Sequence, residues 1–138
     1  MAVRVRLLVR CGEKELELTA LVNSGFETET PQLLLPVPAA RRLGLWPPIQ
    51  ALEETYHTAG GPAKVWVYPE CSQVRVLGTT ASNEVRTDVV VSPIEDEALI
   101  SDKLAGGLEI MVEDFGRGIW RLRGEREAHE TEGPQLWR

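Results

Sequence analysis

Apolar and polar residues alternate along the first two segments of the chain. Residues 2–10 place arginines between apolar neighbours, and residues 15–22 repeat the same period of two. Alternation with this period is typical of a strand that buries one face. Residues 11–14 between them contain a glycine and have the length of a hairpin connection. The opening of the chain therefore predicts a β-hairpin.

The rest of the pattern predicts mostly short strands. Gly/Ser/Asp-containing turns separate apolar runs that favour the extended conformation. The expected strands are 64–68, 72–77, 85–91, 108–112 and 119–122. A turn over residues 78–83 is expected to join the second of these to the third, and residues 113–118 to close a hairpin between the last two.

Two short helices interrupt this pattern. Residues 39–43 follow two prolines and end at Gly44, which is a common way for a short helix to begin and stop. Ser101 or Asp102 is expected to cap a second helix that passes through Leu104, since both side chains accept hydrogen bonds from free backbone N–H groups.

The chain of 138 residues has the length of a single domain. We assign the domain to residues 1–123. Residues 124–138 are charge-rich and are predicted to form a mobile tail, with Trp137 as a residue that docks on another surface.

Charge and hydropathy exclude several classes of function. The formal net charge is −6, with no concentrated basic face, so nucleic acid is not expected as a partner. No apolar run reaches the length of a membrane span and the first residues do not resemble a signal peptide, so we expect no membrane partner and a cytoplasmic location. Cys11 and Cys71 lack metal-binding spacing, which predicts no metal, no cofactor and free thiols by default, with a disulfide left open.

Four short motifs follow one another in a recognisable order. They are Asn23-Ser24-Gly25 directly after an alternating strand, Ala40-Arg41-Arg42-Leu43-Gly44-Leu45, Thr58-Ala59-Gly60-Gly61, and Leu99-Ile100-Ser101-Asp102-Lys103-Leu104. Over roughly residues 2–123 this order resembles the retropepsin-like aspartic peptidases (clan AA type). The resemblance implies a mostly β, closed-barrel acid-protease fold with one or two short helices, acting as a homodimer on an extended peptide or protein substrate.

The resemblance also implies roles for individual residues. Asn23 takes the position of the catalytic aspartate, Ser24 supplies a bracing hydroxyl and Gly25 allows close backbone approach. Substrate contacts are implied for a flap and for the apolar element beside the catalytic loop. The residues are Thr58, Ala59, Gly60, Gly61, Leu99, Ile100 and Ser101.

Asn23 separates this chain from an active peptidase of that family. Two aspartates at a dimer centre share one proton, so that one acts as acid and the other as base. An amide has no titratable proton near neutral pH, and no Asp of the chain is followed by Ser/Thr-Gly. Phe26 and Ser101 also replace smaller residues of the family pattern. Asn23 is an engineered substitution, a natural mark of a binding module, or a residue that deamidation converts to aspartate.

Two functions and one unrelated fold follow from these observations. The first is an aspartic-type endopeptidase homologue that hydrolyses peptides only when position 23 is Asp. The alternative is a non-catalytic peptide-binding or assembly domain that uses the same dimer groove. A small all-β domain unrelated to peptidases is the third possibility. Glu27 and Glu29 are expected to be solvated, and His57 to be a surface residue.

Overall fold

The computed structural model describes residues 2–79 and 82–138. The predicted turn over residues 78–83 therefore lies partly outside the described residues. The elements in chain order are β1 (Arg4–Cys11), β2 (Lys14–Val22), β3 (Gln32–Pro36), α1 (Val37–Arg42), β4 (Leu52–Thr58), β5 (Gly61–Val76), β6 (Val85–Ser92), β7 (Ala98–Ile100), α2 (Asp102–Gly107), β8 (Ile110–Asp114), β9 (Ile119–Leu122) and β10 (His129–Glu130).

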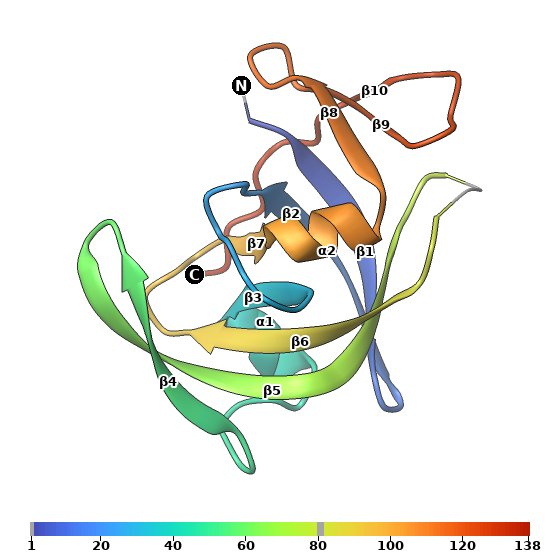
Figure 1. Cartoon of the computed structure of the whole chain (residues 1–138). Helices are drawn as coiled ribbons and strands as arrows, with labels where there is room; N and C mark the ends of the chain where they lie inside the picture. The colour runs from blue at the N-terminus through green and yellow to red at the C-terminus, as the bar shows by residue number, and fades with distance from the viewer. Residues whose placement is uncertain (1, 80–81) are drawn as a thin grey trace.

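Six strands close into a barrel in the order β1-β2-β7-β3-β6-β5 (Figure 1). The closing contact is antiparallel, between β1 and β5, with Leu7 opposite Val76. The short β7 lies between β2, to which it is parallel, and β3, to which it is antiparallel. The prediction of a mostly β, closed-barrel chain with two short helices is therefore confirmed.

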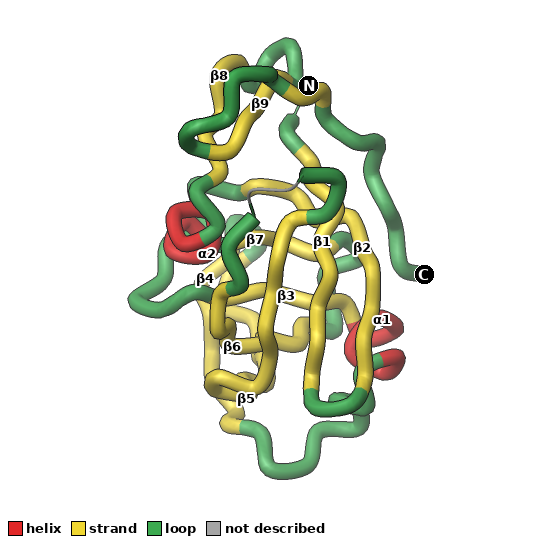
Figure 2. Tube along the Cα trace, turned by 90° about the vertical axis from the view of Figure 1, so that its right-hand side faces the viewer, coloured by secondary structure: helices red, strands yellow, loops and turns green. Residues whose placement is uncertain are grey.

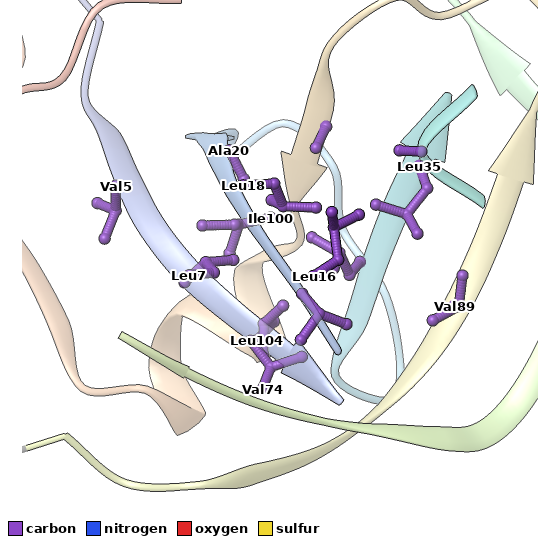
Figure 3. Packing of buried hydrophobic residues seen from close by; sticks show 14 of the residues in the cluster. Val5, Leu7, Leu16, Leu18, Ala20, Leu35, Val74, Val89, Ile100 and Leu104 are labelled. Carbon is purple, nitrogen blue, oxygen red and sulfur yellow. The ribbon is translucent and has the colours of Figure 1, made fainter. Parts of the chain in front are cut away.

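The barrel interior is filled by the apolar residues of the alternating strands. On β1, Val5, Leu7 and Val9 are fully buried, whereas Arg6 and Arg10 on the opposite face are exposed. Figure 3 shows Leu7 near labelled residues from β2, β7 and α2, and Val5 and Val9 belong to the same buried cluster. Burial of such aliphatic side chains is the main force that holds the barrel closed.

Both predicted helices are present, although α1 begins two residues earlier than the expected 39–43 and ends at Arg42. Helix α1 begins one residue after Pro36, and Gly44 just beyond it takes a positive φ of 74°. That φ favours glycine, which explains why the helix ends there. Helix α2 is capped by Ser101, whose hydroxyl accepts a hydrogen bond from Leu104 N–H.

The strand prediction was wrong for β5 and did not include β3, β4, β7 or β10. The strands expected at 64–68 and 72–77 are one strand of 16 residues, β5, with a bulge between Tyr68 and Ser72. Within the bulge Glu70 has φ 51°, and its N–H donates to Asp88 Oδ1 at 2.7 Å. Strand β4, which extends beyond the barrel as the partner of β5, was not predicted at all.

The chain beyond α2 adds a small sheet at one end of the barrel (Figure 1), and Leu108, Trp120 and Leu122 belong to the same core cluster as the barrel residues. Strands β8, β9 and β10 make a separate three-stranded sheet, and the segment after β10 runs along the side of the barrel (Figure 2). Thr19 N–H donates to Gln135 Oε1 at 2.7 Å, and Trp137 N–H donates to Asp96 O at 2.8 Å. Trp137 packs against the core, as the sequence led us to expect of a docking residue. Among the described residues, no helix is long and apolar enough to cross a membrane.

Two free thiols lie side by side where β1 meets β5. Cys11 ends β1, and Cys71 lies in the bulge of β5. A hydrogen bond between the thiols lowers the pKa of Cys11 to about 7, while the same bond, followed by burial, raises the pKa of Cys71. Cys11 is therefore the more easily ionised member of the pair.

Candidate functional site

The Asn23 loop leaves the end of β2 and is held in a tight turn. Asn23 N–H donates to Ile100 O at 3.1 Å, which fixes the start of the loop against β7. Gly25 N–H donates to Asn23 Oδ1 at 3.0 Å, and Phe26 N–H donates to Asn23 O at 3.0 Å. A short side chain that bonds the backbone two residues on is a recognised turn-forming device of Asn and Asp. The predicted turn is thus built by Asn23 itself.

The far side of the loop is attached to the start of α2. Asp102 N–H donates to Phe26 O at 3.0 Å, and Thr28 N–H donates to Asp102 Oδ1 at 3.0 Å. The hydrogen bond from Thr28, more than any other contact, holds the pKa of Asp102 below its ordinary value. A charged acceptor makes the stronger kind of hydrogen bond, so Asp102 ties the loop to the helix.

Ser101 completes this support from within the protein. Its side chain is fully buried, and Oγ accepts hydrogen bonds from Gln32 N–H at 3.0 Å and Leu104 N–H at 3.1 Å. Ser101 N–H donates to Gln32 O at 3.1 Å. One hydroxyl therefore joins β3 to α2 directly behind the Asn23 loop.

The turn of the β4–β5 hairpin faces this loop. Thr58 pairs with Gly61 at the last position of the ladder, and Ala59 and Gly60 form the tip. Thr58 Oγ1 donates to Gly61 O at 2.7 Å and accepts from Gly60 N–H at 3.2 Å. The hairpin projects from one side of the barrel in Figure 1. These residues therefore form the turn of a β-hairpin, and their contact with a substrate stays a prediction.

A cleft of about 360 Å³ separates the hairpin from the loop; we call it the hairpin cleft. Its floor is a small apolar cluster outside the barrel that includes Leu34, Val65 and Leu99. The residues that line it are Asn23, Gly25, Phe26, Leu34, Tyr56, His57, Thr58, Ala59, Ala63, Val65, Ser92, Glu95 and Leu99.

A second hollow of about 510 Å³, the outer groove, lies next to the hairpin cleft. The residues that line it are Gly25, Phe26, Glu27, Thr28, Glu29, Thr30, Gln32, Glu54, Thr55, Tyr56 and His57. The rings of Phe26 and Tyr56, whose centroids are 6.4 Å apart, belong to both hollows. Tyr56 Oη donates to Gln32 Oε1 at 2.9 Å, and burial, followed by the charge of Glu54, raises the pKa of the phenol.

The residues predicted from the sequence are brought together only in part. Lining positions in the hairpin cleft are taken by Asn23, Gly25, Thr58, Ala59 and Leu99. Ser24 is exposed in the loop, and its hydroxyl makes no hydrogen bond to any part of the chain that the structure describes. Gly60 and Gly61 lie in the hairpin turn.

Ile100 and Ser101 do not line the cleft. Both are fully buried behind the Asn23 loop, so they support that loop instead of contacting a ligand. Burial explains this difference, because Ile100 packs in the barrel core and the Ser101 hydroxyl is engaged by backbone N–H groups.

Several lining residues were not among the predicted site residues, and three of them, Tyr56, His57 and Glu95, carry polar groups that a ligand can contact. Tyr56 and His57 come from β4, a strand without the apolar alternation that would have indicated it. Glu95 begins the acidic run Glu95-Asp96-Glu97 just before β7. One signal could have indicated Glu95: it lies just before Leu99-Ile100, the apolar element that the resemblance places beside the Asn23 loop.

The amide of Asn23 limits the hydrogen-bonding and proton-transfer chemistry available at this site. Its Oδ1 is engaged by Gly25, and its Nδ2 makes no hydrogen bond within residues 2–79 and 82–138, so the amide can donate to a ligand carbonyl. It supplies no proton and accepts none near neutral pH. Among those same residues, no group of three or more His, Cys, Asp or Glu is arranged to hold a metal ion.

Comparison with models of known protein families and with curated proteins finds no match for this chain. The loop, the hairpin and the clefts between them are therefore interpreted on their own geometry.

Proposed function

We propose that this protein binds an extended peptide in a groove completed by a second copy of the chain, as a homologue of the retropepsin-like aspartic peptidases. Hydrolysis follows only when position 23 carries Asp. The observation that supports this most strongly is the Asn23 turn, which faces a β-hairpin across a cleft lined by both.

The cleft of a single chain is half of such a site. One chain presents one loop, and acid-base chemistry of this type needs two carboxyl groups close enough to share a proton. The exposed Ser24 and Gly25 leave the loop surface free for contact with a second copy. Homodimer formation and a cytoplasmic location are parts of the same proposal.

An extended ligand suits the exposed edge of the hairpin. Strand β4 pairs only with β5 within the described sheet, and six of its seven residues are exposed. Edge strands offer free backbone N–H and C=O groups, to which a peptide adds as a further strand. Apolar side chains at the cleft floor then receive alternate side chains of the peptide.

A non-catalytic peptide-binding or assembly domain is the second candidate, and Asn23 itself favours it. Loss of general acid-base catalysis removes a factor of about 10²–10⁴ in rate. The amide retains the turn and the free Nδ2 donor, so a binding function needs no change at this position.

The substitution Asn23→Asp tests the proposal. The variant and the Asn23 chain are first compared by size-exclusion chromatography with light scattering, which reports whether each is a dimer. Both are then incubated with a diverse peptide library between about pH 4 and 6, where a carboxylate pair shares one proton. We expect cleavage by Asn23→Asp at a rate at least about 10²-fold above that of the Asn23 chain.

The matched control is Asn23→Ala, which removes the side chain without adding a carboxyl group. A folded Asn23→Asp dimer that binds peptides and cuts none favours the binding domain. A folded protein that remains monomeric in every variant and binds no peptide contradicts both candidates and favours an unrelated all-β domain.

A further inference from the structure

Glu95 is a half-buried carboxylate that lines the hairpin cleft without a cation beside it. The two acids that follow it each have an arginine partner: Asp96 Oδ2 lies 3.5 Å from Arg138 Nε, and Glu97 Oε2 lies 2.5 Å from Arg4 Nε. Glu95 forms no ion pair or hydrogen bond with any residue that the structure describes. The member of the acidic run that faces the cleft is thus the unpaired one.

The surroundings of Glu95 disfavour its negative charge. Burial raises the pKa of its carboxyl group, and the neighbouring charges of Asp96 and Glu97 raise it further. No Lys or Arg lines the hairpin cleft, where His57 is the sole side chain able to carry positive charge among the lining residues. An opposite charge arriving within a few ångströms would stabilise the ionised carboxylate.

The shape of the cleft adds a second requirement on its ligand. Leu34, Val65 and Leu99 give it an apolar floor, whereas Glu95 contributes the one acidic group of its lining. Lys and Arg side chains combine an aliphatic stem with a cationic end, so they can cover apolar surface while the charge pairs with a carboxylate. An aliphatic side chain alone would leave Glu95 partly desolvated and unpaired.

We propose that the hairpin cleft is a subsite for a lysine or arginine side chain of the bound peptide, with Glu95 as the residue that determines this specificity. The inference rests on the proposed function, because it requires a peptide in the cleft. The stem lies on the apolar floor and the cationic group pairs with the Glu95 carboxylate.

The outer groove provides a favourable approach for such a ligand. Its lining contains Glu27, Glu29 and Glu54 and no Lys or Arg. The chain as a whole has a net charge of −6. The acidic side chains of the outer groove, together with Glu95, raise the local concentration of a basic peptide and increase its association rate at low salt.

The test uses fluorescently labelled peptides that differ at one position only, carrying Lys, Arg, norleucine or Glu. Their affinities for the full chain are measured by fluorescence anisotropy at low and moderate salt. We expect the Lys and Arg peptides to bind about tenfold more tightly than the norleucine peptide, as one charge-assisted contact at a half-exposed site provides. Glu95→Gln should abolish this preference, and Glu95→Lys should shift it toward the Glu peptide.

The matched control is Asp96→Asn, which removes the same charge from the adjacent residue outside the cleft lining. Asp96→Asn should retain most of the preference for Lys and Arg peptides. It removes one negative charge, as Glu95→Gln does, so the long-range attraction of a basic peptide changes equally in the two variants. Circular dichroism establishes that each variant is folded.

Failure of this inference is distinguishable from failure of the proposed function. Peptides that bind with no preference for a basic residue, or with a preference that Glu95→Gln leaves unchanged, overturn the subsite while leaving the peptide groove intact. A folded dimer that binds none of the four peptides overturns the proposed function and the subsite together.

Discussion

Ser101→Ala tests whether the Asn23 loop depends on the buried hydroxyl behind it. The substitution removes an acceptor that serves two backbone donors, Gln32 N–H and Leu104 N–H. The first is the link to β3 and the second is the N-cap of α2. No comparable acceptor is introduced by alanine, so both N–H groups lose this partner.

The two losses can be estimated separately. Removal of an N-cap side chain costs about 1 kcal/mol. A partly buried N–H group left without an acceptor costs about 1–2 kcal/mol more. We therefore expect Ser101→Ala to lower the free energy of unfolding by about 2–3 kcal/mol, which corresponds to a fall in Tm of about 6–9 °C for a domain of this size.

The assay is urea denaturation followed by circular dichroism, together with a thermal melt. Ser72→Ala is the matched control, because Ser72 is also a buried serine but its hydroxyl only donates to Thr87 O, at 3.0 Å. Loss of that donor should cost about 1 kcal/mol or less. If Ser101→Ala is no less stable than Ser72→Ala, the double acceptor role of Ser101 is refuted.

Three further outcomes are expected from other parts of the structure. Iodoacetamide should alkylate Cys11 before Cys71, with a rate that rises through about pH 7, as peptide mapping will report; equal rates would contradict this. Because the pKa of Asp102 is lowered in the folded protein, its carboxylate contributes stability at pH values above its ordinary pKa of 3.8, and this stability is lost as the pH falls below that value. Asp102→Asn should therefore make the free energy of unfolding depend less on pH in the acid range. An unchanged dependence counts against the bond to Thr28. Deletion of residues 131–138 should lower Tm, because Trp137 leaves the core surface, and an unchanged melt would mean that this segment adds no stability.

The elements that the sequence predicts well are those whose own residues determine them. Strands β1 and β2 bury one face each, so their alternation is visible without knowledge of their neighbours. Helix α2 carries its own cap in Ser101. The turn at Asn23 was also predictable, because Asn and Gly favour this conformation through local hydrogen bonds and backbone freedom.

The parts that were missed depend on contacts between distant segments. Strand β4 is exposed on both faces and exists because β5 supplies its hydrogen bonds, so no apolar pattern marks it. Glu95 lines the cleft because β7 is inserted between β2 and β3, a topology that the local sequence does not encode. Predicting such residues requires the strand order as well as the strands.

Strand β5 is both a strand of the barrel and one arm of the projecting hairpin. It bends at the bulge that contains Glu70, whose N–H donates to Asp88 Oδ1. The other oxygen of the same carboxylate accepts a hydrogen bond from Thr30 at 2.6 Å, on the stretch that leads away from Asn23. One carboxylate, that of Asp88, therefore fixes both the bend of β5 and the segment that follows the Asn23 loop, so the position of the hairpin and the position of the loop depend on the same residue.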